Sequence, residues 1–169
     1  MESLENLNDL FIHELRDLYD AEKQLVAGLP LFAQAAKSDQ LRRGFEQHLG
    51  ETKEHVSRLE KVLRGLGASP EGKSCKAMAG LIAEAKETLD EDVDPEVLDA
   101  ALIVAAQKIE HYEIAGYGSV CTFGRVLHYD DAVGLLKKTM SEEENTDRKL
   151  SQASERLNEK AQAADQAAI

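Results

Sequence analysis

Four long segments of the chain carry apolar residues at intervals of three and four positions. They span about residues 4–36, 40–66, 95–127 and 131–160. This spacing is typical of amphipathic helices, because residues three and four apart lie on the same face of a helix. A shorter segment with the same spacing spans about residues 75–90. The pattern therefore predicts four long helices and one short helix.

The connections between these segments differ in length. Residues 38–39 separate the first two long helices, and residues 128–130 separate the last two. Links this short are typical of antiparallel helical hairpins. The middle connection is longer and contains the short helix, after which Asp94 and Pro95 give a start signal for the third long helix. We therefore expect an all-α single domain over residues 1–169: a ferritin-like four-helix bundle with one long crossover connection containing a short extra helix.

Local signals predict how the helices begin and end. Ser3, with Asn6 or Asn8, offers N-caps for the first helix. Pro30 lies inside that helix, where we expect a kink and not a break. The alanine-rich tail, residues 161–169, is expected to fray.

Composition and charge exclude several classes of protein. The chain has 11 glycines and 3 prolines in 169 residues, which favours helices, and a formal net charge of -12. That charge argues against a nucleic acid or an anionic membrane as partner, because both require a concentrated basic face. No apolar run is long enough to cross a bilayer, and the start MESLENLNDL does not resemble a signal peptide. With two cysteines and no disulfide framework, we expect a cytoplasmic protein.

Several acidic residues fall on faces that the helices are predicted to bury. At a rotation of about 100° per residue, Glu22 lies at the centre of the apolar stripe of its helix. Glu143 lies on the inward side of the last helix, and Glu110 and Glu113 share one face with apolar neighbours. Glu51 sits at the border of its stripe, about 120° from the centre. Each long helix therefore carries at least one acid toward the bundle interior or its margin.

Other ionisable residues lie near the same faces. His48 and His55 lie about 60° to 80° from the centre of their stripe, and Asp147 follows Glu143 by one turn on the same side. Burying unpaired carboxylates costs several kcal/mol each. The basic residues lie mostly on outward faces: Lys23, Arg42, Lys53, Arg58 and Lys108. A pair of bound metal ions is the better account, because hard divalent cations turn clustered carboxylates into ligands.

The spacing of these residues departs from a known pattern. Dimetal carboxylate bundles use one Glu from each of two helices and a Glu-x-x-His from each of the other two. Here Glu51 is followed three residues later by Glu54, and Glu143 by Thr146. This departure weakens any direct assignment of the activity of ferritin or manganese catalase to this chain.

Four blocks of the sequence resemble one known family. They are DLYDAEKQL (17–25), HLGETKEHVSRLE (48–60), AALIVAAQKIEHYEIAGYG (100–118) and SEEENTDRKL (141–150). The chain resembles the YciE/YciF family of bacterial stress proteins over nearly its whole length. The resemblance implies a ferritin-like bundle, a homodimer and a carboxylate site for two metal ions, although the family is labelled a domain of unknown function.

The resemblance also implies a set of metal ligands. The set, by position in this sequence, comprises Glu22, Glu51, Glu110 and Glu143, completed by Glu113 and by His48 or His55, with Asp147 in reserve. Two iron ions are the expected cofactor, and manganese is the alternative.

Tyrosines and cysteines near these positions have simpler interpretations. Tyr19, Tyr112 and Tyr117 could be hydrogen-bond partners or redox-active neighbours of the site, but core packing is favoured. We expect Cys121 to be buried and Cys75 to be an exposed thiol without a partner.

Three functions fit these residues. The first is a dimetal oxidoreductase that reacts with a small oxidant, either oxidising Fe(II) with O2 or removing peroxide. The alternative is a non-catalytic structural or protein-interaction module with a degraded metal site, which the missing Glu-x-x-His spacing favours. Iron storage is a third, and it would require a hollow shell of many subunits.

Overall fold

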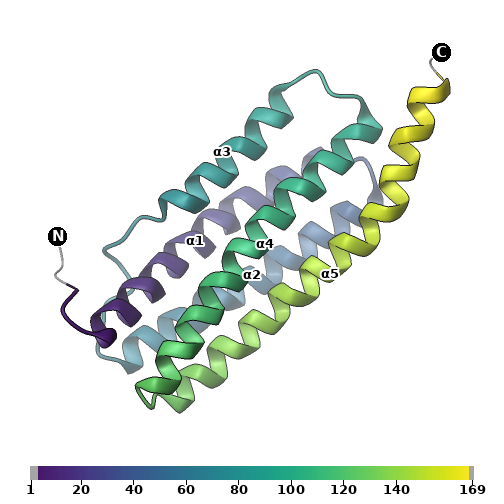
Figure 1. Ribbon diagram of the computed structural model, residues 1–169. Helices are drawn as coiled ribbons and strands as arrows, with labels where there is room; N and C mark the ends of the chain where they lie inside the picture. The colour runs from purple at the N-terminus through teal and green to yellow at the C-terminus, as the bar shows by residue number, and fades with distance from the viewer. Residues whose placement is uncertain (1–3, 168–169) are drawn as a thin grey trace.

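The computed structural model (Figure 1) describes residues 4–167, and the side chains of all of these except residues 90, 96 and 164–167. Within that part of the chain every regular element is a helix. The helices are α1 (Leu7–Ala35), α2 (Asp39–Gly65), α3 (Lys76–Asp90), α4 (Pro95–Val126) and α5 (Asp130–Ala167). The predicted four long helices and one short helix are confirmed.

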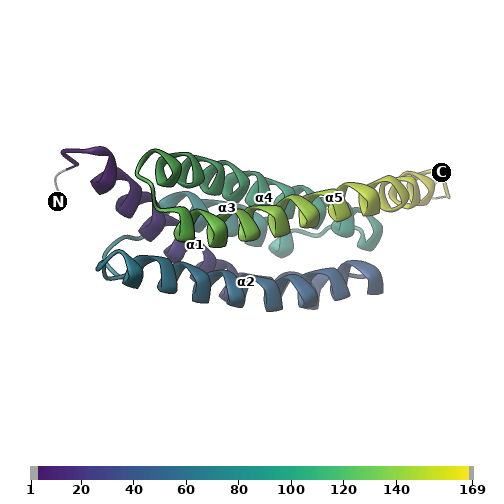
Figure 2. The same ribbon diagram turned by 90° about the horizontal axis from the view of Figure 1, so that it is seen from below.

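The four long helices form a bundle of two hairpins. α1 packs along α2, and α4 packs along α5. The short helix α3 lies on the outside, against α1 and α4, as Figures 1 and 2 show from two directions. Because α3 and its flanking loops carry the chain back along the bundle, α2 and α4 run in the same direction. This is the ferritin-like arrangement with one long crossover connection, as predicted.

Some helix ends differ from the prediction. α1 begins at Leu7 and not at Leu4, because the side chain of Asn6 caps it by accepting a hydrogen bond from the backbone N–H of Asp9 at 3.0 Å. Ser3 lies outside the described residues. The helix continues through Pro30, so the proline does not break it.

The last helix is longer than expected. α5 extends to Ala167, so residues 161–167 are helical, contrary to the expected fraying. Alanine and glutamine are strong helix formers, which gives a physical reason for the extension.

The apolar core consists of two clusters, one in each half of the bundle. Leu29, Phe32 and Phe45 belong to the first cluster. Phe11 and Leu63 belong to the second. On each long helix the buried apolar residues pass from one cluster to the other near mid-length. The polar residues that the sequence places on inward faces lie at this level, between the two clusters.

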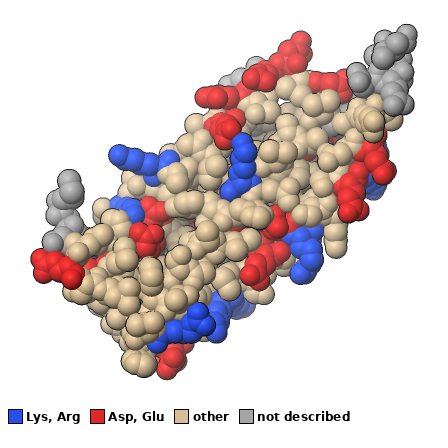
Figure 3. Space-filling view, in the orientation of Figure 1, with Lys and Arg blue, Asp and Glu red and all other residues tan. Residues whose placement is uncertain are grey.

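The surface has mixed charge. On the face drawn in Figure 3, Lys and Arg side chains lie among Asp and Glu side chains and do not gather in one basic area. None of the described helices is long and apolar enough to cross a membrane.

Close packing of α4 against its neighbours depends on glycine. A Cβ atom added at Gly124 would lie 2.8 Å from Cγ2 of Val133 on α5 and 3.5 Å from the ring of Phe11 on α1. Valine is stiff about χ1, so Val133 cannot easily move aside. The absence of a side chain at Gly124 therefore allows α4 to approach both helices.

We expect Gly124→Ala to lower the free energy of unfolding by about 1 kcal/mol, because overpacking costs about 1–3 kcal/mol while the gain in helix propensity is about 1 kcal/mol. The matched control is Gly134→Ala on α5, where an added Cβ meets nothing within 4 Å. This control should stabilise the protein. Urea unfolding of both variants measures the difference, and a Gly124→Ala protein as stable as the control would contradict the packing argument.

Candidate metal centre

Six ionisable side chains meet at mid-height of the bundle and are almost completely buried. All four carboxylates have at most 2% of their surface exposed, and the two histidines at most 3%. They come from all four long helices: Glu22 from α1, His48 and His55 from α2, Glu110 and Glu113 from α4, and Glu143 from α5.

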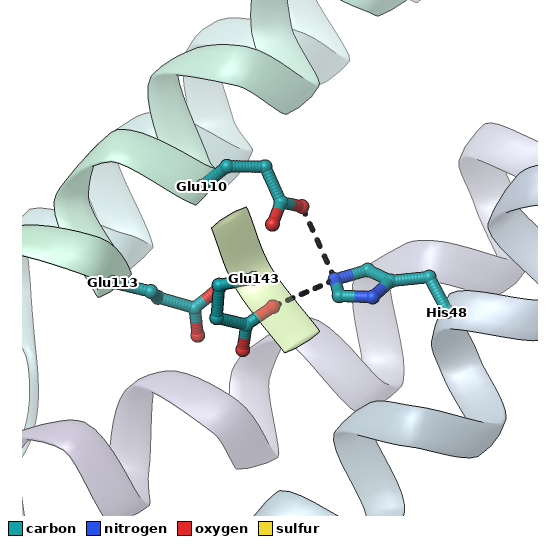
Figure 4. A group of neighbouring side chains, drawn as sticks. All are labelled: His48, Glu110, Glu113 and Glu143. Carbon is teal, nitrogen blue, oxygen red and sulfur yellow. Dashed lines mark ion pairs between the residues drawn. The ribbon is translucent and has the colours of Figure 1, made fainter. Parts of the chain in front are cut away.

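One group of donors surrounds His48 (Figure 4). Its Nε2 lies 3.1 Å from Oε1 of Glu110 and 3.7 Å from Oε2 of Glu143. Glu113 lies beside Glu143 in the same view. One donor atom from each of these four residues can be chosen so that all lie within 4.8 Å of one another. This spacing is compatible with ligation of a single cation.

A second group surrounds His55. Its Nδ1 lies 2.8 Å from Oε1 of Glu143 and 3.4 Å from Oε1 of Glu22. These three residues also offer donor atoms within 4.8 Å of one another. Tyr117, fully buried, donates a hydrogen bond of 2.5 Å to Glu22. Because Glu143 belongs to both groups, the two candidate positions are adjacent and share a carboxylate.

Many of the inward-facing polar atoms of this cluster lack hydrogen bonds. Among the described residues, the buried side-chain nitrogens and oxygens that make no hydrogen bond all belong to the six residues of the two groups. Both oxygens of Glu113 and both of Glu143 are among them. Buried polar atoms normally have partners, so a convergent set without them fits the binding of metal ions.

The outward-facing nitrogen of each histidine has a partner outside the two groups. Nε2 of His55 lies 3.0 Å from Oε2 of Glu142, which also forms a salt bridge with Arg58. Nδ1 of His48 lies 3.3 Å from the hydroxyl of Thr146 and 3.5 Å from Glu51. These contacts orient Nδ1 of His55 and Nε2 of His48 toward the interior, as carboxylate partners do for metal-binding histidines.

The local electrostatics favour protonated carboxyls beside protonated imidazoles. Burial, with the charges of Glu22 and Glu143, raises the pKa of Glu113 well above its usual range. Burial raises the pKa of Glu143 to about 8, although His55 opposes the rise. Burial lowers the pKa of His55, but Glu143 and Glu22 outweigh it and raise that pKa to about 10. Burial also lowers the pKa of His48, but the neighbouring glutamates, Glu110 foremost, together outweigh it and raise that pKa well above its usual value.

The structure brings together six of the eight residues that the sequence predicted as ligands. Glu51 lies outside both groups, with 27% of its side chain exposed, beside the outer nitrogen of His48. Asp147 also lies outside, where its carboxylate contacts His111 at 3.3 Å and Gln107 at 3.1 Å. Asp147 projects toward α4 one turn beyond the cluster and therefore does not reach it.

Two expectations about the neighbours of the site were wrong. Arg58 is not on an outward face, because only 13% of its side chain is exposed and it reaches across to Glu142 and Thr139 on α5. Its partner Glu142 in turn contacts His55. Cys75 is buried and not exposed, and its sulfur lies 3.0 Å from the hydroxyl of Tyr112.

The numbers of glutamates and histidines in the two groups equal those of the dimetal carboxylate bundles, although their spacing along the sequence differs. Those proteins place four glutamates and two histidines in the bundle core. This chain does the same, but both histidines come from α2, two turns apart, and two glutamates come from α4. The missing Glu-x-x-His spacing therefore reflects a redistribution of donors among helices and not a loss of donors.

Comparison with known proteins identifies the family. Residues 6–163 match the family model described as a domain of unknown function, DUF892. The chain belongs to this family. It is 43% identical over 162 residues to protein YciF of Escherichia coli, covering 95% of this chain and 98% of YciF. The resemblance to the YciE/YciF family is thus confirmed.

Solved structures agree with this assignment. The crystal structure of the Escherichia coli stress protein YciF matches with a TM-score of 0.90 and 42% identity, over 93% of this chain and 99% of YciF. A protein of Rhodopseudomonas palustris, YcfI, provisionally described as structural, matches with a TM-score of 0.85 and 40% identity, over 89% of this chain and 98% of YcfI. A protein of Xanthomonas campestris shares the fold. It matches with a TM-score of 0.77 and 17% identity, over 95% of this chain and 99% of that protein.

The raised pKa values predict how the stability of chelator-treated protein depends on pH. Groups with a raised pKa bind more protons in the folded state than in the unfolded state, so stability falls as pH rises through their folded pKa. Stabilisation by Glu143 is lost from about pH 4.5 to 8, and stabilisation by His55 is lost from about pH 6.5 to 10. We expect the free energy of unfolding to fall by at least about 1.4 kcal/mol between roughly pH 6 and 9.

In the variant Glu113→Gln, the free energy of unfolding should fall less steeply with pH, by up to about 1.4 kcal/mol per pH unit, because one titrating group is removed. The control is Glu54→Gln, at an exposed position of the same bundle. Urea unfolding at a series of pH values measures both slopes. Equal slopes in Glu113→Gln and Glu54→Gln would contradict the assignment.

Proposed function

We propose that this protein binds two metal ions, iron or alternatively manganese, in the two groups of donors that share Glu143. The observation that supports the proposal is the set of buried carboxylate and imidazole atoms that converge without hydrogen bonds. Four deprotonated carboxylates balance the charge of two divalent cations, and the two histidines then stay neutral. Metal binding therefore removes the repulsion that otherwise requires some of these carboxyls to be protonated.

The types of donor favour these metals. Carboxylates suit hard cations, and imidazole extends the choice to iron and other transition metals. No thiolate belongs to either group. Each group contains three or four donor residues, fewer than the six ligands of an octahedral ion, so positions remain for a small molecule.

The activity that we propose is oxidation of Fe(II) by O2 or removal of peroxide, in a homodimeric protein of the cytoplasm. Bound redox metals supply the electron transfer. The surrounding residues contribute orientation and restrict water: Tyr117 holds one oxygen of Glu22, and the apolar clusters on either side limit contact of the site with water. The competing proposal is a structural module, which the provisional description of the Rhodopseudomonas palustris relative supports.

Anaerobic titration with Fe(II) tests metal binding. We expect about two ions per chain, because there are two adjacent groups of donors. Glu22→Gln should lose one ion, and Glu143→Gln should lose both, since Glu143 is shared. Asp147→Asn is the matched control and should keep both ions, because Asp147 lies outside the groups. The absence of bound metal in the wild-type protein after this loading would refute the proposal.

Turnover separates an enzyme from a structural module. The loaded protein is mixed with O2 or with hydrogen peroxide, and oxidation of added Fe(II) or loss of peroxide is followed. Multiple turnovers support the oxidoreductase. Two tightly bound ions without any turnover support the structural alternative.

We expect Glu142→Gln to weaken metal binding by about 10- to 100-fold, because a carboxylate that orients a ligating histidine contributes on this scale. Glu144→Gln, an exposed position two residues further along α5, is the matched control and should bind as the wild type does. Competition with a chelator of known affinity measures both constants. Equal affinities in the two variants would show that Glu142 does not position His55.

A further inference from the structure

A deep groove runs between the two hairpins in the half of the bundle near the α1–α2 turn. Its volume is about 550 Å³. Its walls are mainly apolar and include Leu25, Leu29, Phe32, Phe45, Ile109 and Leu150. Along α2 it extends from Asp39 to Glu51, which corresponds to about 18 Å at roughly 1.5 Å per residue. Pockets of this size and character commonly bind small organic molecules.

Small residues help to create this space. Gly44 on α2, Ala106 on α4 and Ala153 on α5 all line the groove. A Cβ atom added at Gly44 would meet nothing within 4 Å. α2 and α5 also pack against each other much less extensively than α4 packs on α5 or α1 on α2. The groove therefore opens along the seam between α2 and α5.

Two cations line this groove, one from each of the helices that border its opening. Arg43 lies on α2 and Lys149 on α5, and both are exposed and line the groove. Neither forms a salt bridge with another of the described residues, although Lys149 is near enough to Glu51 to lower its pKa slightly. Among the acids of the rim, Asp39 pairs with Arg42 at 2.7 Å, whereas Glu51 accepts a hydrogen bond from the neutral Gln47 and keeps its negative charge. The rim therefore carries two cations and one uncompensated acid, a net positive charge in a protein whose net charge is -12.

We propose that this groove binds a single-chain aliphatic monocarboxylate, a fatty acid. The alkyl chain lies among the apolar walls, where burial of its surface provides the main driving force. The carboxylate lies at the opening between Arg43 and Lys149. The proposal goes beyond the metal site and does not require bound metal, because it rests on residues of the groove and its rim.

Calorimetric titration with decanoate, below its micellar concentration, tests the proposal. We expect saturable binding of one molecule per chain. Gly44→Leu, which extends a side chain from the wall of the groove, should weaken this binding at least tenfold. Gly50→Leu is the matched control: it is also an exposed glycine of α2 with nothing within 4 Å of an added Cβ, but it does not line the groove. It should bind decanoate as the wild type does.

The charge of the headgroup is tested separately. The double variant Arg43→Gln/Lys149→Gln should weaken binding of decanoate at least threefold while leaving binding of neutral 1-decanol unchanged. Lys53→Gln, an exposed position on α2 that does not line this groove, is the control. Glu22→Gln, which removes a metal donor that does not line the groove, should keep full decanoate affinity even if it loses metal.

Three outcomes would overturn the proposal. The first is no saturable binding of decanoate by the wild-type protein. The second is equal affinity in Gly44→Leu and Gly50→Leu. The third is a light-scattering measurement in which Gly44→Leu dissociates an oligomer that Gly50→Leu retains, which would assign the groove to contact with a second copy of the chain. Each of these leaves the metal titration unaffected, so the two proposals fail independently.

Discussion

Electrostatic repulsion among four buried carboxylates is the constraint on which the rest of this structure depends. Glu22, Glu110, Glu113 and Glu143 approach one another where water is largely excluded, and only two imidazoles lie among them. Such a cluster is costly unless protons or cations neutralise it. The apolar clusters on either side make the cost larger by lowering the local polarity, and they also hold the four helices in place. Stability of the bundle therefore depends on what neutralises this cluster, and a metal ion bound there, as we propose, would add to that stability.

The partners of the histidines extend this coupling toward the surface. Arg58 engages Glu142, Glu142 engages His55, and His55 faces the shared carboxylate of Glu143. His48 has weaker outer partners, at 3.3 Å and 3.5 Å. The two histidines thus differ in how they are held: His55 contacts a charged pair, whereas His48 contacts a hydroxyl and a partly exposed carboxylate.

The sequence was sufficient to predict the fold and most of the site, because helix periodicity determines which face a residue occupies. Glu22, Glu110, Glu113 and Glu143 were located in this way. Contacts between helices were not predictable from one helix at a time. Glu142 starts about 100° from the inward direction, yet its long side chain reaches α2 to meet His55. Cys75 precedes α3, and only the docking of α3 buries it against Tyr112.

The groove makes the two donor groups unequal in access. His48 and Glu110 line it, whereas Glu22 and His55 do not. A molecule in the groove therefore meets the first group before the second. The second group instead contacts Tyr117 through Glu22 and the Arg58–Glu142 pair through His55. The placement of both histidines on α2 produces this asymmetry, because their separation by two turns puts one beside the groove and the other beyond its end. The same six donors thus form one group that borders the groove and one that does not.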